Sequence, residues 1–166
     1  YAVSKQFEKH SMDVKALADK GDAFTSDKDK NILQSINFYK LVQQNYKTLS
    51  PESSIESIVE IFSTTEQKII PIIDSHKSLV GIVDFEEVKA IIFNPYRVKF
   101  MTISEVMHQP KGLILFEDKP EKIMTLFEKS KTSILPVIHK GKYFGFLSKI
   151  DVLESYRKRL KEMVID

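Results

Sequence analysis

An internal repeat limits the fold of this chain more than any other feature of its sequence. Residues 70–74, IPIID, and 79–84, LVGIVD, return in the same order as residues 135–139, LPVIH, and 143–148, YFGFLS. Each copy therefore contains an apolar run with a central proline, followed by an apolar run around a glycine. A repeat of this length is too long for a solenoid and predicts a pseudo-twofold domain made of two similar halves.

The spacing between the two copies is almost constant. Pro71 and Pro136 are 65 positions apart, whereas Gly81 and Gly145 are 64 apart, so the second copy is one residue shorter between these points. A surface turn tolerates such a change more readily than a strand or helix does. We therefore place the missing residue in the turn of a hairpin.

Each half is predicted to contain a β-α-β-β-α unit. In the first half we expect a short strand over 46–49, a hairpin from 69–73 and 79–83, and a helix starting near Asp84. Between the first two strands, apolar residues share one face of a predicted helix: Ile55, Ile58, Val59 and Phe62.

The second half follows the same order. Residues 111–116 are predicted to be extended, and Pro120 suits the first turn of a helix because proline needs no helical N–H partner there. A turn at 140–142 joins the two strands of the repeated hairpin, and the last helix is expected from about 150 to 163.

The segments outside the two copies are expected to be less regular. Residues 1–44 read as a linker that packs onto the domain, with a loop over 25–30 before a helix-like stretch at 31–36. Asn94–Arg97 should break the second helix and begin a connector that ends near 103–107.

Composition excludes several classes of site. The chain has 166 residues, 42% of them hydrophobic, which is enough for a packed core, and it has no cysteine for a disulfide or thiolate site. Its 25 basic and 23 acidic residues are interleaved, so no basic face indicates nucleic acid. The four histidines are isolated, so no metal site is expected.

The sequence shows no membrane span, but it begins at Tyr1 rather than Met, and we expect it to be part of a longer protein.

Taken together, the proline strand, the glycine strand and the Ser-x-x-Asp helix start resemble a tandem pair of cystathionine-β-synthase (CBS) motifs, also called a Bateman module. The resemblance implies a mixed α/β (α+β) fold with two β-α-β-β-α motifs in pseudo-twofold arrangement and an N-terminal linker segment. The expected parts are a linker at 1–44, CBS motif 1 at 45–95, a connector at 96–105, CBS motif 2 at 106–156 and a basic helix end at 157–166.

The flanks resemble a more particular group. Residues 7–11, 17–22 and 27–30 are similar to the segment that leaves the last membrane helix of prokaryotic ClC chloride channels and transporters, and residues 155–161 are similar to their C-terminal helix. This resemblance implies a non-catalytic regulatory domain on the cytoplasmic face of the cell membrane. It further implies a homodimer, joined to the membrane domain of the same chain, with no nucleic-acid partner.

In CBS modules that bind adenosine-type ligands, the carboxylate of the Ser-x-x-Asp motif accepts hydrogen bonds from the ribose, and the hydroxyl lies near the phosphates. Carried over here, Asp151 holds the ribose and Ser148 lies beside the phosphate. The resemblance also points to framing residues from the first half: Thr48, Lys47 as a phosphate neighbour, and the backbone at Ile69 and Ile70. No cofactor is required, and the implied ligand is ATP, ADP or AMP.

Two further observations keep the interpretation open. In the first half, Asp84 and Glu87 replace Ser148 and Asp151, and their negative charges disfavour a phosphate, so one occupied site is expected. Alternatively, Ser148 only caps a helix and Asp151 is a favourable acidic residue in its first turn. A CBS pair from another transporter, or from a metabolic enzyme such as inosine-monophosphate dehydrogenase, is the alternative origin of the fragment.

Overall fold

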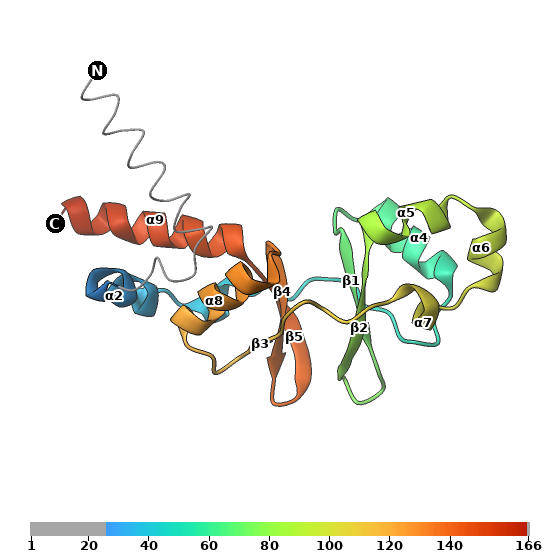
Figure 1. The fold of residues 1–166 in the computed structure, drawn as a ribbon, viewed down its shortest axis with the longest axis horizontal. Helices are drawn as coiled ribbons and strands as arrows, with labels where there is room; N and C mark the ends of the chain where they lie inside the picture. The colour runs from blue at the N-terminus through green and yellow to red at the C-terminus, as the bar shows by residue number, and fades with distance from the viewer. Residues whose placement is uncertain (1–25, 166) are drawn as a thin grey trace, which may run out of the picture. The chain divides into compact units, whose positions relative to one another are not determined.

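The computed structural model describes residues 26–165 and contains two compact units (Figure 1). Among the described residues, unit 1 comprises 26–42, Lys111–Leu135 and 146–165, whereas unit 2 comprises Gln43–Pro110 and Pro136–Gly145. The elements, in chain order, are α2 (Asp27–Ser35), α3 (Phe38–Leu41), α4 (Ile55–Thr64), β1 (Ile69–Ile73), β2 (Leu79–Asp84), α5 (Phe85–Ile92), α6 (Pro95–Phe100), α7 (Ile103–Val106), β3 (Ile114–Leu115), α8 (Pro120–Ser130), β4 (Ile134–His139), β5 (Lys142–Ser148) and α9 (Lys149–Ile165).

The sheet of unit 2 is built on the predicted hairpin. β1 and β2 pair antiparallel, with Pro71 opposite Ile82. Single bridges extend this pair: Leu49 lies parallel to Ile72, and His108 lies antiparallel to Ile82. The strand expected over 46–49 is therefore reduced to one bridge at Leu49, whose N–H donates to the carbonyl of Pro71 at 3.1 Å.

Helices α4 and α5 supply the apolar layer that covers this sheet. α4 begins at the cap Ser54, whose hydroxyl accepts a hydrogen bond from the N–H of Ser57 at 3.3 Å. Ile61 is buried on α4, whereas Val59 and Phe62 of the expected face are only partly buried. The buried side chains of this core are Ile55, Ile58, Ile61, Ile70, Ile72, Val83, Val88, Ile103 and Val106.

The second helix of the first half breaks before Asn94, as predicted, and the connector that follows contains a helix of its own. The helix does end at Ile92, but Asn94 caps a new helix, α6, by accepting hydrogen bonds from the N–H groups of Tyr96 and Arg97. Pro95 occupies the first helical position, where its missing N–H costs nothing. The Asn-Pro pair therefore separates two helices instead of starting an irregular segment.

In unit 1, the N-terminal segment is more regular than expected. The predicted loop over 25–30 is wrong within the described residues, because α2 already begins at Asp27. Ser26 caps it by accepting from the N–H of Asp29 at 3.1 Å, and the acidic residues of the first turn suit the positive end of the helix. The expected features at residues 1–25 lie outside the described residues.

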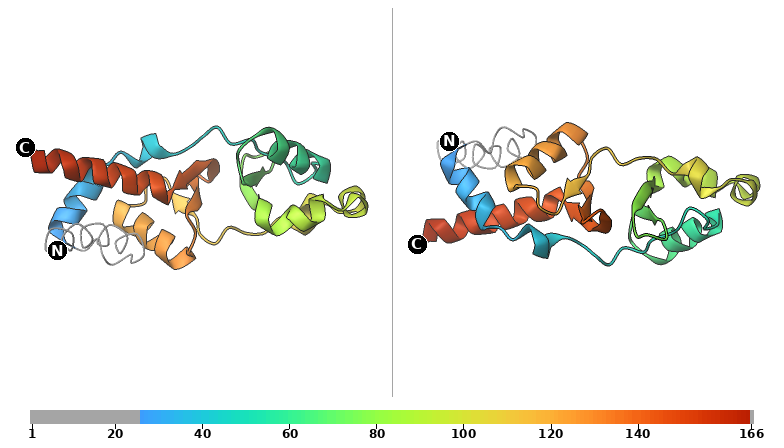
Figure 2. Two further views of the ribbon diagram at one scale, coloured as in Figure 1. Left: turned by 90° about the horizontal axis from the view of Figure 1, so that it is seen from above. Right: turned by 90° about the horizontal axis from the view of Figure 1, so that it is seen from below.

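Helix α2 is packed onto the rest of unit 1. Ile32 and Leu33 are 1% and 0% exposed, and α2 contacts α8 and α9. Figure 2 shows these three helices side by side. The hydroxyl of Tyr156 on α9 also donates a short hydrogen bond to the carboxylate of Asp29 on α2. The expectation that this segment packs onto the domain is confirmed for its described part.

The second copy repeats the elements of the first. α8 begins with Pro120 at its first position, and β3, β4 and β5 form one sheet in that order. Lys140 and Gly141 form the two-residue hairpin turn with φ angles of 52° and 77°, a conformation that glycine adopts without strain. The tip of this hairpin belongs to unit 2, where the N–H of Tyr143 donates to the carbonyl of Lys77 at 2.9 Å.

Candidate functional site

Two of the predicted ligand-binding residues lie at the start of α9 in unit 1. Ser148 ends β5, and Asp151 lies in the first turn of α9, with both residues half-buried. Between them, the N–H of Lys149 donates to the carbonyl of Ser133 at 2.8 Å, which ties the start of α9 to the segment before β4. The strand-to-helix transition predicted from the Ser-x-x-Asp pattern is therefore confirmed.

A pocket of about 340 Å³ adjoins this helix start. Its lining residues are Phe127, Glu128, Lys131, Thr132, Ser133 and Lys149. They include two lysines and two hydroxyl residues against one acidic residue, whereas Ser148 and Asp151 are not among them. The excess of positive charge and hydroxyl groups suits an anionic ligand such as a phosphate.

Sequence reasoning missed the residues that precede β4. A signal for them was present, since Thr132 and Ser133 are the repeat partners, 65 positions later, of Gln67 and Lys68. The residues that would surround the base were expected beside Ile69 in the first half. The equivalent segment of the second half was not named. No sequence pattern indicated Lys131. It is the C-terminal cap of α8 and has a left-handed backbone conformation, with φ of 54°.

The other predicted residues lie in unit 2, where their backbone is already engaged. The side chain of Gln67 joins the segment before Leu49 to β1: its Nε2 donates to the carbonyls of Lys47 and Ile69 at 3.1 and 3.0 Å, and its Oε1 accepts from the N–H of Lys47 at 3.0 Å. Ile69 and Ile70 are 7% and 0% exposed, so their side chains belong to the core. A base placed here has to displace Gln67 to reach these backbone groups.

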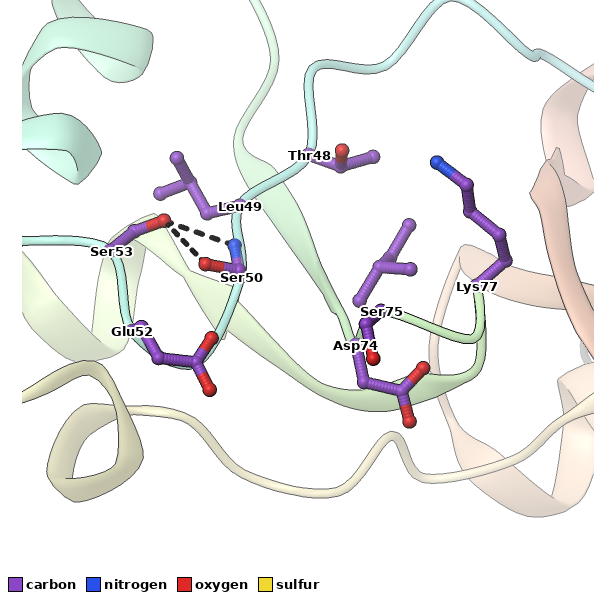
Figure 3. A pocket seen from close by; sticks show the side chains of 9 residues that line it. Thr48, Leu49, Ser50, Glu52, Ser53, Asp74, Ser75 and Lys77 are labelled. Carbon is purple, nitrogen blue, oxygen red and sulfur yellow. Dashed lines mark hydrogen bonds between the residues drawn. The ribbon is translucent and has the colours of Figure 1, made fainter.

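Thr48 lines a different pocket, of about 350 Å³, at the other end of β1 (Figure 3). Asp74 shapes the turn there, because its Oδ1 accepts from the N–H groups of His76 and Ser78 at 2.9 Å each. Ser53 accepts from the N–H of Ser50 at 3.0 Å. Of the predicted residues, only Thr48 lines this pocket. Its lining has two acidic residues, Asp74 and Glu52, against one lysine, Lys77, so its net negative charge disfavours phosphate.

The corresponding helix start in the first half has its own internal partners. Asp84 caps α5 by accepting from the N–H of Glu86 at 2.9 Å. The carboxylate of Glu87 lies 2.7 Å from Nε2 of His108. The two carboxylates that replace the Ser-x-x-Asp pair therefore serve to cap a helix and to contact His108, the single bridge residue that follows α7.

Two tyrosines resist ionisation. Burial raises the pKa of Tyr143 above its ordinary value of 10.0, and the nearby Tyr46 raises it further. The pKa of Tyr156 is raised by burial and by its hydrogen bond to Asp29. The hydroxyl of Tyr156 donates to Asp29, and both phenols keep their protons well above the pH at which an exposed tyrosine ionises.

The described part of the chain has neither a cluster of metal-binding side chains nor a helix suited to a membrane. Residues 26–165 contain no group of three histidine or carboxylate side chains arranged to hold a metal ion. Over the same residues, no helix has both the length and the apolar character to cross a bilayer.

Comparison with known proteins identifies the fold. Residues 39–94 match the family model for the CBS domain, a stretch that runs from α3 to just beyond α5 and includes the first repeat copy. The chain therefore contains a CBS domain over these residues. Its mixed helices and small sheets are consistent with a pair of CBS motifs.

Solved structures with this fold cover most of the chain. A CBS domain protein from Streptococcus pneumoniae TIGR4 matches with a TM-score of 0.70 at 13% identity, over 84% of this chain and 98% of that one. CBSX2, solved in complex with AMP, matches with a TM-score of 0.62 at 21% identity, over 75% and 98%. The protein MJ1004 from Methanocaldococcus jannaschii matches with a TM-score of 0.65 at 21% identity, over 74% of this chain but only 60% of its own. At these identities the likeness concerns the fold alone.

Proposed function

We propose that this chain is a non-catalytic regulatory CBS pair that binds one adenine nucleotide at the start of α9. The observation that carries the proposal is the combination of Ser148 and Asp151 at that helix start with a pocket containing Lys131 and Lys149. The AMP complex of CBSX2, which shares the fold, supports the choice of ligand.

The chemistry of the residues suits the two ends of a nucleotide. The carboxylate of Asp151 can accept hydrogen bonds from both hydroxyls of a ribose, because a carboxylate has two oxygens and each carries two lone pairs. The phosphates are attracted by the lysine ammonium groups and by the N-terminal amides of a 17-residue helix. Asp151 already has an interaction within the protein, so ribose binding rearranges that contact.

A single site per chain follows from the asymmetry of the repeat. At the first-half position, Asp84 and Glu87 present two carboxylates and no hydroxyl, and both already have partners within the chain. A phosphate placed there meets two like charges, which cost binding energy at short distance. We therefore propose a stoichiometry of one nucleotide.

Isothermal titration calorimetry with ATP, ADP and AMP tests this site. Asp151→Ala removes hydrogen bonds to a charged group, each worth roughly 1.5–3 kcal/mol, so affinity should fall at least tenfold. Glu87→Ala is the matched control, because it removes an acidic side chain from the equivalent helix start and should leave affinity unchanged. Saturable binding that is equally strong in Asp151→Ala contradicts the ribose role.

The helix-capping alternative is tested with the same variants. If Asp151 serves only the first turn of α9, Asp151→Ala lowers the free energy of unfolding by roughly 0.3–1 kcal/mol and no nucleotide binds to the wild-type chain. Urea unfolding in the absence of ligand measures that contribution separately from binding. The absence of calorimetric heat with all three nucleotides would leave this alternative in place.

We further propose that the module is the cytosolic C-terminal domain of a ClC-type chloride channel or transporter and that it forms a homodimer. The resemblance of its flanks to ClC sequences supports this origin. A ligand acts on such a dimer only through different affinities for two of its arrangements. Sedimentation equilibrium tests the dimer, since a monomer at micromolar concentration contradicts it.

The alternative origin is a CBS pair from another transporter or from a metabolic enzyme such as inosine-monophosphate dehydrogenase. The residues encoded before Tyr1 discriminate between these origins. Several long apolar segments support a membrane transporter, whereas an α/β sequence without such segments contradicts it and supports the enzyme.

A further inference from the structure

An aromatic and basic surface surrounds α6 in unit 2. It consists of Phe93, Tyr96, Arg97, Lys99 and Phe100, which we call the α6 surface. The three aromatic side chains are 77%, 72% and 61% exposed, in that order. Neighbouring aromatic side chains with this degree of exposure indicate an interaction surface for a protein, a membrane or a ligand.

The exposure of these rings is a consequence of how α6 is anchored. Val98 and Met101 pack against the core of unit 2, and α6 contacts α4 and α5, so the opposite side of the short helix is turned outward. In Figure 1, α6 lies beyond α4 and α5 on the side away from β1 and β2. Tyr96 and Phe100 also pack against each other, with ring centroids 4.7 Å apart. The rings are therefore presented by a structured helix.

The charge of the α6 surface is positive. No carboxylate occurs between Phe93 and Ile103, and neither Arg97 nor Lys99 forms an ion pair with any described residue. The ammonium of Lys99 lies 5.5 Å from the ring centroid of Phe100. Lys89 on the neighbouring helix is paired with Glu86 at 2.6 Å, so we count only two cations.

We propose that the α6 surface docks on an anionic lipid bilayer. Tyrosine and other aromatic rings favour the headgroup region, and lysine and arginine are attracted to anionic lipids. Phe93, Tyr96 and Phe100 enter this region while Arg97 and Lys99 meet the lipid phosphates. A second copy of the chain is the alternative occupant of this surface, and self-association in gel filtration distinguishes it below. The inference does not depend on nucleotide binding.

Co-sedimentation with vesicles tests the electrostatic part of this proposal. We expect the chain to bind vesicles of phosphatidylcholine mixed with phosphatidylserine and not vesicles of phosphatidylcholine alone. Arg97→Gln with Lys99→Gln should weaken the partition coefficient about thirtyfold, given the contribution of each cation near an anionic surface. The matched control, Arg157→Gln with Lys158→Gln, removes two exposed cations of α9 that form no ion pair with any described residue, and it should leave most of the binding.

Tryptophan fluorescence tests the insertion of the rings. The chain contains no tryptophan, so Phe100→Trp introduces a single reporter. Its emission should shift to shorter wavelength with anionic vesicles and be quenched by brominated lipid chains. Met163→Trp places the reporter at a 52% exposed site on α9 and should not respond. Phe100→Ser should weaken binding, whereas the charge-conserving Arg97→Lys should retain it.

Specific outcomes overturn the proposal. It is wrong if the chain ignores anionic vesicles, or if the α6 and α9 charge variants lose binding equally. It is also wrong if Phe100→Ser abolishes concentration-dependent self-association in gel filtration while vesicle binding is absent, because the surface then joins two copies of the chain. Urea unfolding of every variant verifies that each one is folded.

Discussion

The hydrogen bond from Tyr156 to Asp29 should be a measurable part of what holds α2 onto unit 1. Tyr156→Phe removes only the hydroxyl, and the ring, which is 2% exposed, stays in place, so no large cavity is formed. A hydrogen bond to a charged group is worth roughly 1.5–3 kcal/mol. Because Asp29 keeps a second contact with the hydroxyl of Ser26 at 2.5 Å, we expect a loss near the lower end, about 1.5 kcal/mol.

Urea unfolding followed by far-UV circular dichroism measures this loss. With a slope of about 2 kcal/mol/M, the midpoint should fall by about 0.7 M without a change in slope. Tyr96→Phe, at a tyrosine that is 72% exposed, is the matched control and should stay within about 0.3 kcal/mol of the wild type.

A double-mutant cycle isolates the contact from other effects of the substitution. If the hydroxyl acts through Asp29, Tyr156→Phe should cost little in an Asp29→Ala background, giving a coupling energy of about 1.5 kcal/mol. Equal losses in both backgrounds would refute the reasoning, because they would show that the hydroxyl stabilises unit 1 without Asp29.

Three further predictions follow from the same structure. Phe127→Ala, at a fully buried ring, should destabilise the chain by about 3–5 kcal/mol in urea unfolding, whereas Phe93→Ala should change stability by less than about 0.5 kcal/mol; similar losses contradict this core assignment. Lys131→Gly should stabilise the chain by about 1 kcal/mol, because glycine adopts the left-handed conformation without strain. The same variant should weaken ATP binding in calorimetry, because it removes a cation from the pocket. A loss of stability contradicts the strain argument. The free energy of unfolding should fall as pH rises above about 10, because the raised pKa of Tyr143 keeps its phenol protonated in the folded chain while it ionises in the unfolded chain. In urea titrations at alkaline pH, Tyr143→Phe should reduce that fall.

Local sequence chemistry predicted most of the elements that the structure contains. Proline in the first turn placed the start of α8, and the apolar runs around Pro71 and Gly81 placed the first hairpin. These features depend on residues close together in the chain. The N-terminal loop was mispredicted because the charged run after Ser26 resembles a turn, although Ser26 is also a helix cap.

The candidate site was predicted in part. The pattern at Ser148 and Asp151 correctly indicated a strand entering a helix, since spacing alone defines it. The hydrogen bonds between Lys47 and Gln67, 20 residues later in the chain, could not be predicted from the sequence, because they depend on how two separate segments pack together. Whether nucleotide binds at Asp151 stays a prediction for calorimetry.

The sequence by itself determined the duplicated strand and helix pattern, the chemical difference between the two copies, and the resemblance to CBS motifs. Only the tertiary structure decided which polar groups are occupied by residues far along the chain: Glu87 by His108, and the backbone of Lys47 by Gln67. It also placed Lys131 beside Lys149 and turned the rings of α6 outward. The physical reason is that periodicity reports which face of an element is apolar, whereas partners and exposure depend on the packing of residues far apart in the chain.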